Sequence, residues 1–224
     1  MVGMPARTPP TAPGGDAPGL RADALHNRHR IVEAARAAFA ERGIDVPMSA
    51  IARRAGVGVA TLYRRFPTRE ALVTEVFADQ LTACASLVDD GLADPDPWRG
   101  FCSVVERVCA MQAADRGFTG AFLTTFPGAV PFEEKRERAE RGLTELIRRA
   151  KAAGRLRPDF ALADLTLVFL ANCGAASGPP EAAAASSRRL VAYLLQSFEN
   201  TERRRPLPAA PEIGLDQIPD LSTG

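Results

Sequence analysis

The stretch AGVGVATLYRRFPTREAL, residues 55–72, places an eight-residue segment between two helix breakers, Gly58 and Pro67. Near its end the segment carries two consecutive arginines, Arg64 and Arg65, followed by Phe66. A helix this short is unstable by itself in water, because nucleation costs more free energy than one or two turns return. Neighbouring helices must therefore hold it, and the residues around it indicate what it does.

Helical periodicity continues on both sides of this segment. Upstream, apolar residues at spacings of three and four predict a helix over residues 27–42, which Gly43 ends as a left-handed cap. A second helix is expected over residues 48–55, with Pro47 suited to its first turn. Downstream, Thr68 is placed to cap a fourth helix. The N-terminal part is thus predicted to form three helices and the start of a fourth.

Two short helices joined by an Ala-Gly-Val-Gly turn and braced by a longer first helix form a helix-turn-helix motif. Helical spacing assigns an inward set of side chains that packs the motif together: Ile51, Ala52, Val57, Leu62 and Phe66. The outward set combines small residues and arginines at i, i+4 spacing: Ala60, Thr61, Arg64 and Arg65. Such a face fits the major groove of DNA, where guanidinium groups reach guanine edges or phosphates.

The remainder of the chain also shows helical spacing and almost no strand-like alternation, so the fold class is expected to be all-α. A loop follows the fourth helix, and a fifth helix is marked by apolar residues from Trp98 to Met111. Four further helices are predicted, the first of them short: residues 118–126, 132–153, 159–176 and 181–198. These helices are expected to form a bundle.

The composition divides the chain into two folded parts with extensions. Residues 1–22 and 202–224 are rich in Pro, Gly and Ala and are expected to be disordered. The helix-turn-helix domain is assigned to residues 23–75 and the helical bundle to residues 76–201. Because this boundary lies inside the predicted fourth helix, the two parts are expected to be joined rigidly.

Charge is concentrated in the N-terminal part. The whole chain has a formal net charge of +1, but residues 21–75 contain ten arginines and six acidic residues. A basic module of this kind favours a polyanionic partner. Arg53 and Arg54 are candidates either for phosphate contact or for plain surface exposure. The segment from Arg21 to Arg30 is a candidate for further contacts to the minor groove or to phosphate.

Several other classes of protein are disfavoured. No apolar run approaches the roughly 20 residues that span a bilayer, and the N-terminus lacks the apolar core of a secretory signal. We therefore expect a cytoplasmic protein without a membrane partner. The cysteines are expected to be reduced packing residues, with redox sensing as the alternative: Cys84, Cys102, Cys109 and Cys173.

Neither a metal centre nor a catalytic site is indicated. No CxxC or Cys/His spacing points to zinc, and His26 and His29 lack a cysteine or carboxylate to complete a ligand set. The sequence contains no P-loop, no GxGxxG, no HExxH and no pattern of a catalytic triad. We expect no cofactor, no metal and no enzyme activity.

The segment IVEAARAAFAERGIDVPMSAIARRAGVGVATLYRRFPTREALVTEVF, residues 31–77, resembles the N-terminal DNA-binding domain of the tetracycline-repressor (TetR) family. The resemblance rests on a joint pattern of residues: Ala34, Phe39, Gly43, Ile51, Ala52, Ala55-Gly56-Val57, Thr61-Leu62-Tyr63, Phe66, Arg69 and Leu72. It covers about a fifth of the chain. The later helices match the family's ligand-binding and dimerisation domain in number and placement only.

The resemblance implies a set of DNA-binding residues. On the third helix it places Val59, Ala60, Thr61, Tyr63, Arg64 and Arg65 at the DNA. Arg69 takes the place of the family's usual phosphate-binding lysine, and both residue types bind phosphate. Pro47 stands where the family usually has a Thr or Ser that touches phosphate. Ser49 either substitutes for that residue, or the protein does without its phosphate contact.

The C-terminal bundle is implied to bind a small-molecule effector. Candidate lining residues are Phe101, Val105, Phe118, Phe122, Phe126, Phe169 and Asn172. The aromatic residues are equally compatible with ordinary bundle packing. Asn172 is polar inside an apolar helix, so it either orients a ligand or pairs across a dimer seam.

The implied function is that of a transcriptional regulator, most simply a repressor. Two copies would join through the last two helices, and the paired third helices would enter successive major grooves of a palindromic operator. The unknown effector would release the protein from double-stranded DNA. The alternatives are a ligand-independent activator or co-regulator, and a helical small-molecule- or partner-binding protein with a vestigial helix-turn-helix.

Overall fold

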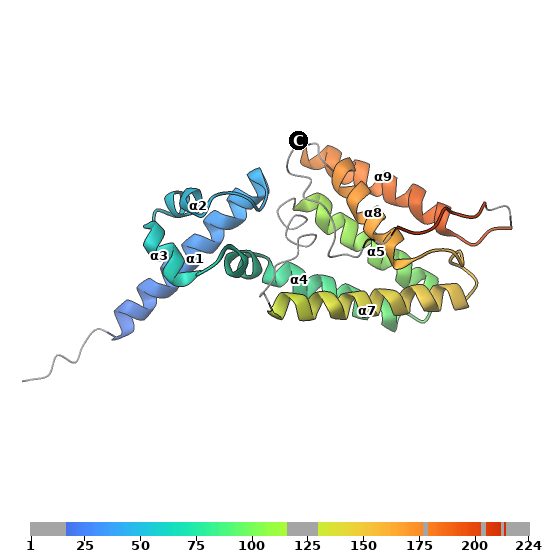
Figure 1. The fold of residues 1–224 in the computed structure, drawn as a ribbon, viewed down its shortest axis with the longest axis horizontal. Helices are drawn as coiled ribbons and strands as arrows, with labels where there is room; N and C mark the ends of the chain where they lie inside the picture. Colours follow the sequence, from blue (N-terminus) through green and yellow to red (C-terminus); the bar gives the residue numbers. More distant parts are fainter. Residues whose placement is uncertain (1–16, 116–129, 177–178, 203–204, 212, 214–224) are drawn as a thin grey trace, which may run out of the picture.

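The computed structural model describes residues 17–115, 130–176, 179–202, 205–211 and 213. Within these residues every secondary-structure element is an α-helix. The one strand-type pairing among them is an isolated bridge between Leu156 and Glu199. The all-α class predicted from the periodicity is confirmed. Figure 1 shows the helices as two groups, with α1, α2 and α3 at one end of the molecule.

The N-terminal group contains α1 (Ala17–Arg42), α2 (Met48–Ala55) and α3 (Val59–Arg65). The predicted bounds of α2 are confirmed, but α1 begins ten residues before the predicted start. Part of the arm that was expected to be disordered is therefore helical. Its Ala, Leu and Arg residues favour a helix, and Pro18 lies in the first turn, where its missing N–H costs nothing.

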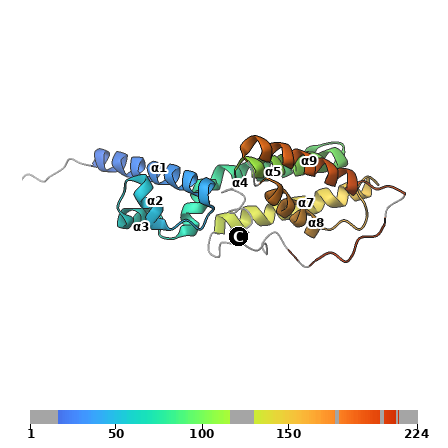
Figure 2. The ribbon, with the colours of Figure 1, turned by 90° about the horizontal axis from the view of Figure 1, so that it is seen from above.

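The long helix α4 (Arg69–Ala93) joins the two groups. It begins where the sequence predicted, because Thr68 Oγ1 accepts a hydrogen bond of 3.2 Å from the backbone N–H of Ala71. Figure 2 shows α4 extending from the N-terminal group into the C-terminal one. The predicted position of the domain boundary, inside this helix, thus corresponds to a continuous element.

The C-terminal group contains α5 (Pro97–Ala114), α7 (Val130–Ala152), α8 (Leu162–Ala175) and α9 (Pro180–Phe198). Each corresponds to a predicted helix, with ends that differ by a few residues. The short helix predicted over residues 118–126 lies outside the described residues.

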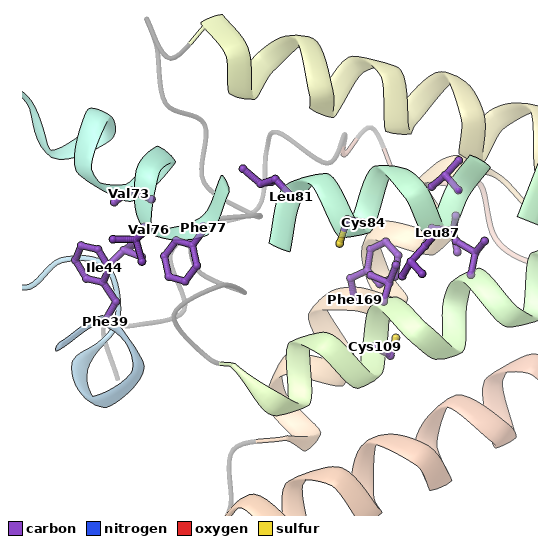
Figure 3. Close-up of a cluster of buried hydrophobic side chains, with 14 of the residues drawn as sticks. Phe39, Ile44, Val73, Val76, Phe77, Leu81, Cys84, Leu87, Cys109 and Phe169 are labelled. Atoms are coloured by element: carbon purple, nitrogen blue, oxygen red, sulfur yellow. The ribbon is translucent and has the colours of Figure 1, made fainter. Parts of the chain in front are cut away.

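Helix α4 contributes to two successive parts of the hydrophobic core, which Figure 3 shows. At its N-terminal end Phe77 stacks on Phe39 of α1, with ring centroids 6.0 Å apart. Further along, buried Cys84 and Leu87 lie beside residues of α5 and α8. Both ends of α4 are therefore packed, which supports the rigid connection inferred from the sequence.

By length and composition alone, α4 is also apolar enough to span a membrane. A core helix of a folded protein passes the same test when its apolar side chains are buried against neighbours. In α4 these neighbours are present, because Leu72, Val73 and Phe77 are completely buried in the structure. The burial favours a core helix.

The chain beyond α9 folds back onto the α7–α8 connection. Arg157 forms an ion pair of 2.6 Å with Asp159 and also donates a hydrogen bond to the backbone carbonyl of Arg205. The N–H of Leu207 donates to Asp159 Oδ2 at 3.1 Å. Residues 205 and 207 were expected to be disordered together with the whole tail, and these contacts correct that expectation for them.

Candidate nucleic-acid interface

The turn between α2 and α3 has the geometry that its sequence requires. Gly56 ends α2 with a φ of 64°, a left-handed conformation that favours glycine. Two turn hydrogen bonds close the end of the helix, from Gly56 N to Arg53 O (3.1 Å) and from Val57 N to Ala52 O (3.0 Å). Gly58 then precedes α3 in an extended conformation. The predicted helix-turn-helix motif is thereby confirmed.

Helix α3 is divided into a packed face and an open face. Leu62 is fully buried and Phe66, directly after the helix, is 1% exposed. The opposite face carries the side chains predicted to meet DNA: Val59, Ala60, Tyr63, Arg64 and Arg65, all exposed, with Thr61 partly buried. The inward residues Ile51 and Ala52 of α2 are fully buried, which completes the predicted packing. Burial therefore divides α3 as its periodicity predicted.

One contact orders the open face. Arg64 Nη2 donates a hydrogen bond of 3.0 Å to Thr61 Oγ1, one turn earlier on α3. The contact leaves the other guanidinium nitrogens available, so Arg64 is still able to bind the edge of a guanine. The bonded pair on this surface is therefore Thr61 and Arg64, three residues apart. The sequence had predicted pairs of residues four apart.

Several arginines of the N-terminal group are bound to protein groups. Arg28 forms an ion pair of 2.9 Å with Glu75 of α4, and its guanidinium lies 4.7 Å from the ring centroid of Phe66. Arg54 forms two hydrogen bonds, 2.6 and 2.7 Å, with the carboxylate of Glu41. This pairing lowers the pKa of Glu41 and raises that of Arg54. The net positive charge therefore overstates the number of cations free to meet DNA.

Arg69 has a structural contact that the sequence did not reveal. From the first turn of α4, its Nη1 donates hydrogen bonds to the backbone carbonyls of Ile44 (2.5 Å) and Val46 (3.1 Å). These carbonyls belong to the loop between α1 and α2. The contact ties that loop to α4, while Nε and Nη2 remain as further donors. Ser49, the other predicted phosphate ligand, is exposed at the start of α2.

The predicted effector-binding residues lie in packed surroundings where they are described. Phe101, Val105, Phe169 and Asn172 are between 0 and 1% exposed. Phe101 stacks on Trp98 and meets the edge of Phe160, each at 5.6 Å between centroids. Phe118, Phe122 and Phe126 lie outside the described residues. For Phe101 the packing observed is that of an aromatic core cluster.

Two cavities with other linings lie among the described residues, one within the C-terminal group and one between it and α1. One, of about 470 Å³, lies between α5 and α9 and is lined in part by Ala110, Ser187 and Val191. The other, of about 490 Å³, lies between α1 and the ends of α5, α8 and α9, next to Arg36 and Asp115. None of the predicted effector-binding residues lines either cavity.

Among the predicted effector-binding residues that the structure describes, Asn172 has a buried polar atom that could still accept a hydrogen bond. Its Nδ2 donates hydrogen bonds of 3.0 Å to Cys109 O and to Gln112 Oε1, both on α5. Its Oδ1 is buried and has no hydrogen-bond partner among the described residues. A buried carboxamide oxygen without a donor is costly, so a donor brought by a ligand would stabilise it.

The cysteines do not form a reactive or metal-binding centre in the described residues. None of the four forms a disulfide bond, and burial raises the pKa of Cys84, Cys102 and Cys109 to about 12. These three thiols are therefore protonated at neutral pH, which disfavours a role as nucleophile. Among the same residues, no three His, Cys, Asp or Glu side chains gather at one point.

Comparisons with known proteins match both groups of helices. Residues 31–76 match the family model for bacterial regulatory proteins of the tetR family, and residues 96–197 match that of the SbtR-like transcriptional regulator C-terminal domain. An HTH-type transcriptional regulator of Staphylococcus aureus is 43% identical over 54 residues. That match spans 24% of this chain and 29% of the length of that protein, so it concerns the helix-turn-helix region alone.

Solved structures extend the similarity over most of the chain. A TetR transcriptional regulator from Streptomyces coelicolor is 31% identical, with 78% of this chain and 99% of that chain covered and a TM-score of 0.48. The ketosteroid transcriptional regulator KstR2 of Mycobacterium tuberculosis is 20% identical, with coverages of 78% and 95% and a TM-score of 0.58. The latter likeness shows a shared fold.

Proposed function

The chain belongs to the TetR family of transcription regulators, and from this premise we propose that it is a homodimeric repressor, released from a palindromic operator by a small-molecule effector. Members of the family are DNA-binding transcription factors with a helix-turn-helix and are not enzymes. The repressor activity, the palindrome, the dimer and the effector are the parts that we propose. We assign the protein's activity to the cytoplasm in the same proposal.

The open face of α3 is the observation that carries the proposal. Val59 and Tyr63 are 43% and 46% exposed although both are large and hydrophobic, and Arg64 and Arg65 project beside them. Small residues at the start of α3 allow the helix to lie deep in a major groove, and the arginines then reach guanine edges. Val59 and Tyr63 are four residues apart and therefore adjoin on one face of α3, and adjoining exposed apolar side chains favour a binding face.

Phosphate contacts would fix the orientation of this helix. We assign them to Arg69 through its remaining guanidinium nitrogens, to the hydroxyl of Tyr63, and to Ser49 at the start of α2. These groups come from α2, from α3 itself and from α4, which suits contacts to the backbone on both sides of a groove. They carry no base information of their own, so sequence preference would come from α3.

The dimer is assigned to α8 and α9. Leu167 on α8 is 43% exposed and Tyr193 on α9 is 58% exposed, so each helix presents a large hydrophobic side chain to solvent. The exposed positions around them are mostly small: Ala171, Gly174, Ala182, Ala185 and Ala192. Small residues let helices approach closely, which favours a four-helix seam between two copies.

The effector is assigned to the C-terminal group near Asn172, whose buried Oδ1 has no donor among the described residues. A small molecule that binds one dimer state better than the other shifts the equilibrium by its differential affinity. A coupling of about 1–3 kcal/mol is typical of such systems. Binding to successive major grooves requires the two α3 helices to be about 35 Å apart. If the effector-bound dimer holds them at another separation, the operator is released.

An electrophoretic mobility shift with DNA from upstream of the protein's own gene tests the proposal. At roughly 150 mM salt the wild-type protein should retain a palindrome-containing fragment in the presence of excess unrelated DNA. Light scattering on the same sample should give the mass of a dimer. Failure to retain any such fragment contradicts the repressor and favours a vestigial motif, and transcription that rises with added protein favours the activator.

A further inference from the structure

Helix α3 has few contacts of its own to hold its direction. Among its seven residues, Leu62 is the one that is buried. Its N-cap, Gly58, has no side chain to accept from the first turn; Leu62 N–H makes the ordinary helical bond to Gly58 O, and Thr61 N–H shares the same carbonyl. The direction in which α3 leaves the motif therefore depends strongly on the turn before it.

That turn is held from outside the motif by Arg30 of α1. The turn hydrogen bonds described above use the carbonyls of Ala52 and Arg53, and they leave the later carbonyls at the end of α2 without helical partners. Arg30 Nη2 donates to two of these, at 2.5 Å to Ala55 O and at 3.4 Å to Gly56 O. A cation at this position also interacts favourably with the negative end of the α2 dipole.

The fit between Arg30 and the turn is close. A Cβ built on Gly56 would lie 2.5 Å from Arg30 Nη2, which is closer than real Cβ atoms approach their neighbours. Gly56 is thus favoured for its left-handed backbone, and a Cβ at this position would displace the Arg30 guanidinium from the turn. From the sequence, Arg30 was a candidate for contact with DNA. In the structure its guanidinium is bound to the protein backbone instead.

We infer that Arg30 is a positioning residue for DNA recognition: it fixes the α2–α3 turn and thereby the direction of α3, without reading the DNA itself. This inference rests on the proposed function for its DNA readout. The competing role is a direct bond to phosphate through the other guanidinium nitrogens. The two roles differ in their salt dependence, because removing one phosphate ligand lowers the slope of log K against log salt by about 0.9.

The first experiment compares Arg30→Met with Arg36→Met in the full-length dimer. Both variants remove one guanidinium from α1 and keep an unbranched apolar stem, and Arg36 lines the cavity between α1 and the ends of α5, α8 and α9 and not the α2–α3 turn. Affinities are measured for the retained upstream fragment and for unrelated DNA over a series of salt concentrations.

For Arg30→Met we expect the affinity for the retained fragment to fall about tenfold, because the variant has no charged donor for the carbonyls at the end of α2. Affinity for unrelated DNA should stay within about twofold, and the salt slope should not change. Arg36→Met should leave both affinities unchanged. A parallel decrease on both DNAs with a slope lower by about 0.9 overturns the inference and makes Arg30 a phosphate ligand.

The second experiment needs no DNA. Amide hydrogen exchange should speed up at Val57, Thr61 and Leu62 in Arg30→Met, relative to the amide of Val105 in α5 as an internal reference. Unchanged exchange at these three amides overturns the inference even if the protein binds no DNA at all. If Arg30→Met does not fold, Arg30→Gln replaces it in both experiments, since it also removes the charge on which the salt slope depends and leaves only an uncharged, weaker donor for the carbonyls.

Discussion

Arg69 Nη1 donates a hydrogen bond of 2.5 Å to the backbone carbonyl of Ile44, and so joins the start of α4 to the loop between α1 and α2. The same nitrogen also bonds to Val46 O at 3.1 Å. The residue that the sequence assigned to the DNA backbone is therefore a stabilising contact inside the N-terminal group as well. Its two roles are separable, because they affect different measurements.

Replacing Arg69 by Ala should lower both stability and DNA affinity. We expect the free energy of unfolding to fall by about 1.5–3 kcal/mol, since two backbone carbonyls lose a charged donor. Affinity should fall alike for all DNA sequences, with a salt slope lower by about 0.9. Urea unfolding and salt titrations measure the two effects. A change in base preference alone would show that Arg69 reads bases.

The conservative change Arg69→Lys is the matched control for that prediction. An ammonium keeps the charge that attracts a phosphate, but it lacks the planar fork that spans several acceptors. The salt slope should therefore stay near that of the wild type, while the stability still decreases in part. Equal decreases in the Ala and Lys variants on both measurements would argue against two separable roles.

Arg64→Ala and Arg65→Ala should relax base preference. Each arginine that makes a bidentate contact with guanine contributes about 1–3 kcal/mol of discrimination against the wrong base. Competition binding with single-base variants of the retained fragment measures the change, position by position. Uniform weakening across all variants would place the arginine on phosphate instead.

Gly56→Ala should destabilise the protein much more than Gly58→Ala. At Gly56 the left-handed backbone costs a residue with a Cβ about 1–2 kcal/mol, and the Cβ would also displace the Arg30 guanidinium from its bonds to the turn. At Gly58 the φ is −67° and a Cβ would meet Thr61 Oγ1 at an ordinary 3.9 Å. Urea unfolding of the two variants gives the comparison, and equal destabilisation would contradict it.

The ion pair between Arg157 and Asp159 predicts a pH dependence. The Arg157 side chain, helped by the N–H of Leu207, holds the pKa of Asp159 well below its usual range. The stabilisation is therefore complete above the unfolded pKa of roughly 3.9 and is lost as the pH falls further, towards the folded pKa.

Asp159→Asn measures that contribution. The difference in unfolding free energy between wild type and variant should be constant from about pH 5 to pH 7 and shrink below roughly pH 4. Amide exchange at Leu207 should be faster in the variant at neutral pH, because its acceptor is weaker. A difference that grows as the pH falls would contradict the assignment.

The residues of the proposed effector site could not be assigned from the sequence alone. Helical spacing cannot tell an aromatic residue that lines a cavity from one that fills a core, because both face inward from their helix. Phe101 and Phe169 are packed in the structure, and the described cavities have other linings. Asn172 was singled out as a polar residue in an apolar helix, and its unsatisfied Oδ1 is known only from the structure.

The sequence by itself determined the helix-turn-helix and its two faces. Breakers, caps and helical periodicity are local properties, so the ends of α2 and the inward Leu62 were predictable from a few neighbouring residues. The start of α1 was predicted ten residues too late, because composition suggested disorder where helix propensity continued through a tolerated proline.

Only the tertiary structure decided which arginines bind groups of the protein itself. Arg28, Arg30, Arg54 and Arg69 all lie in the basic N-terminal part, yet each is bound to a carbonyl or carboxylate of the protein. Arg28, Arg30 and Arg69 reach partners 25 to 47 residues away, and Arg54 reaches Glu41 on a neighbouring helix. A flexible guanidinium binds whatever acceptor the folded chain brings near it, and packing between helices, which local sequence does not encode, sets that acceptor.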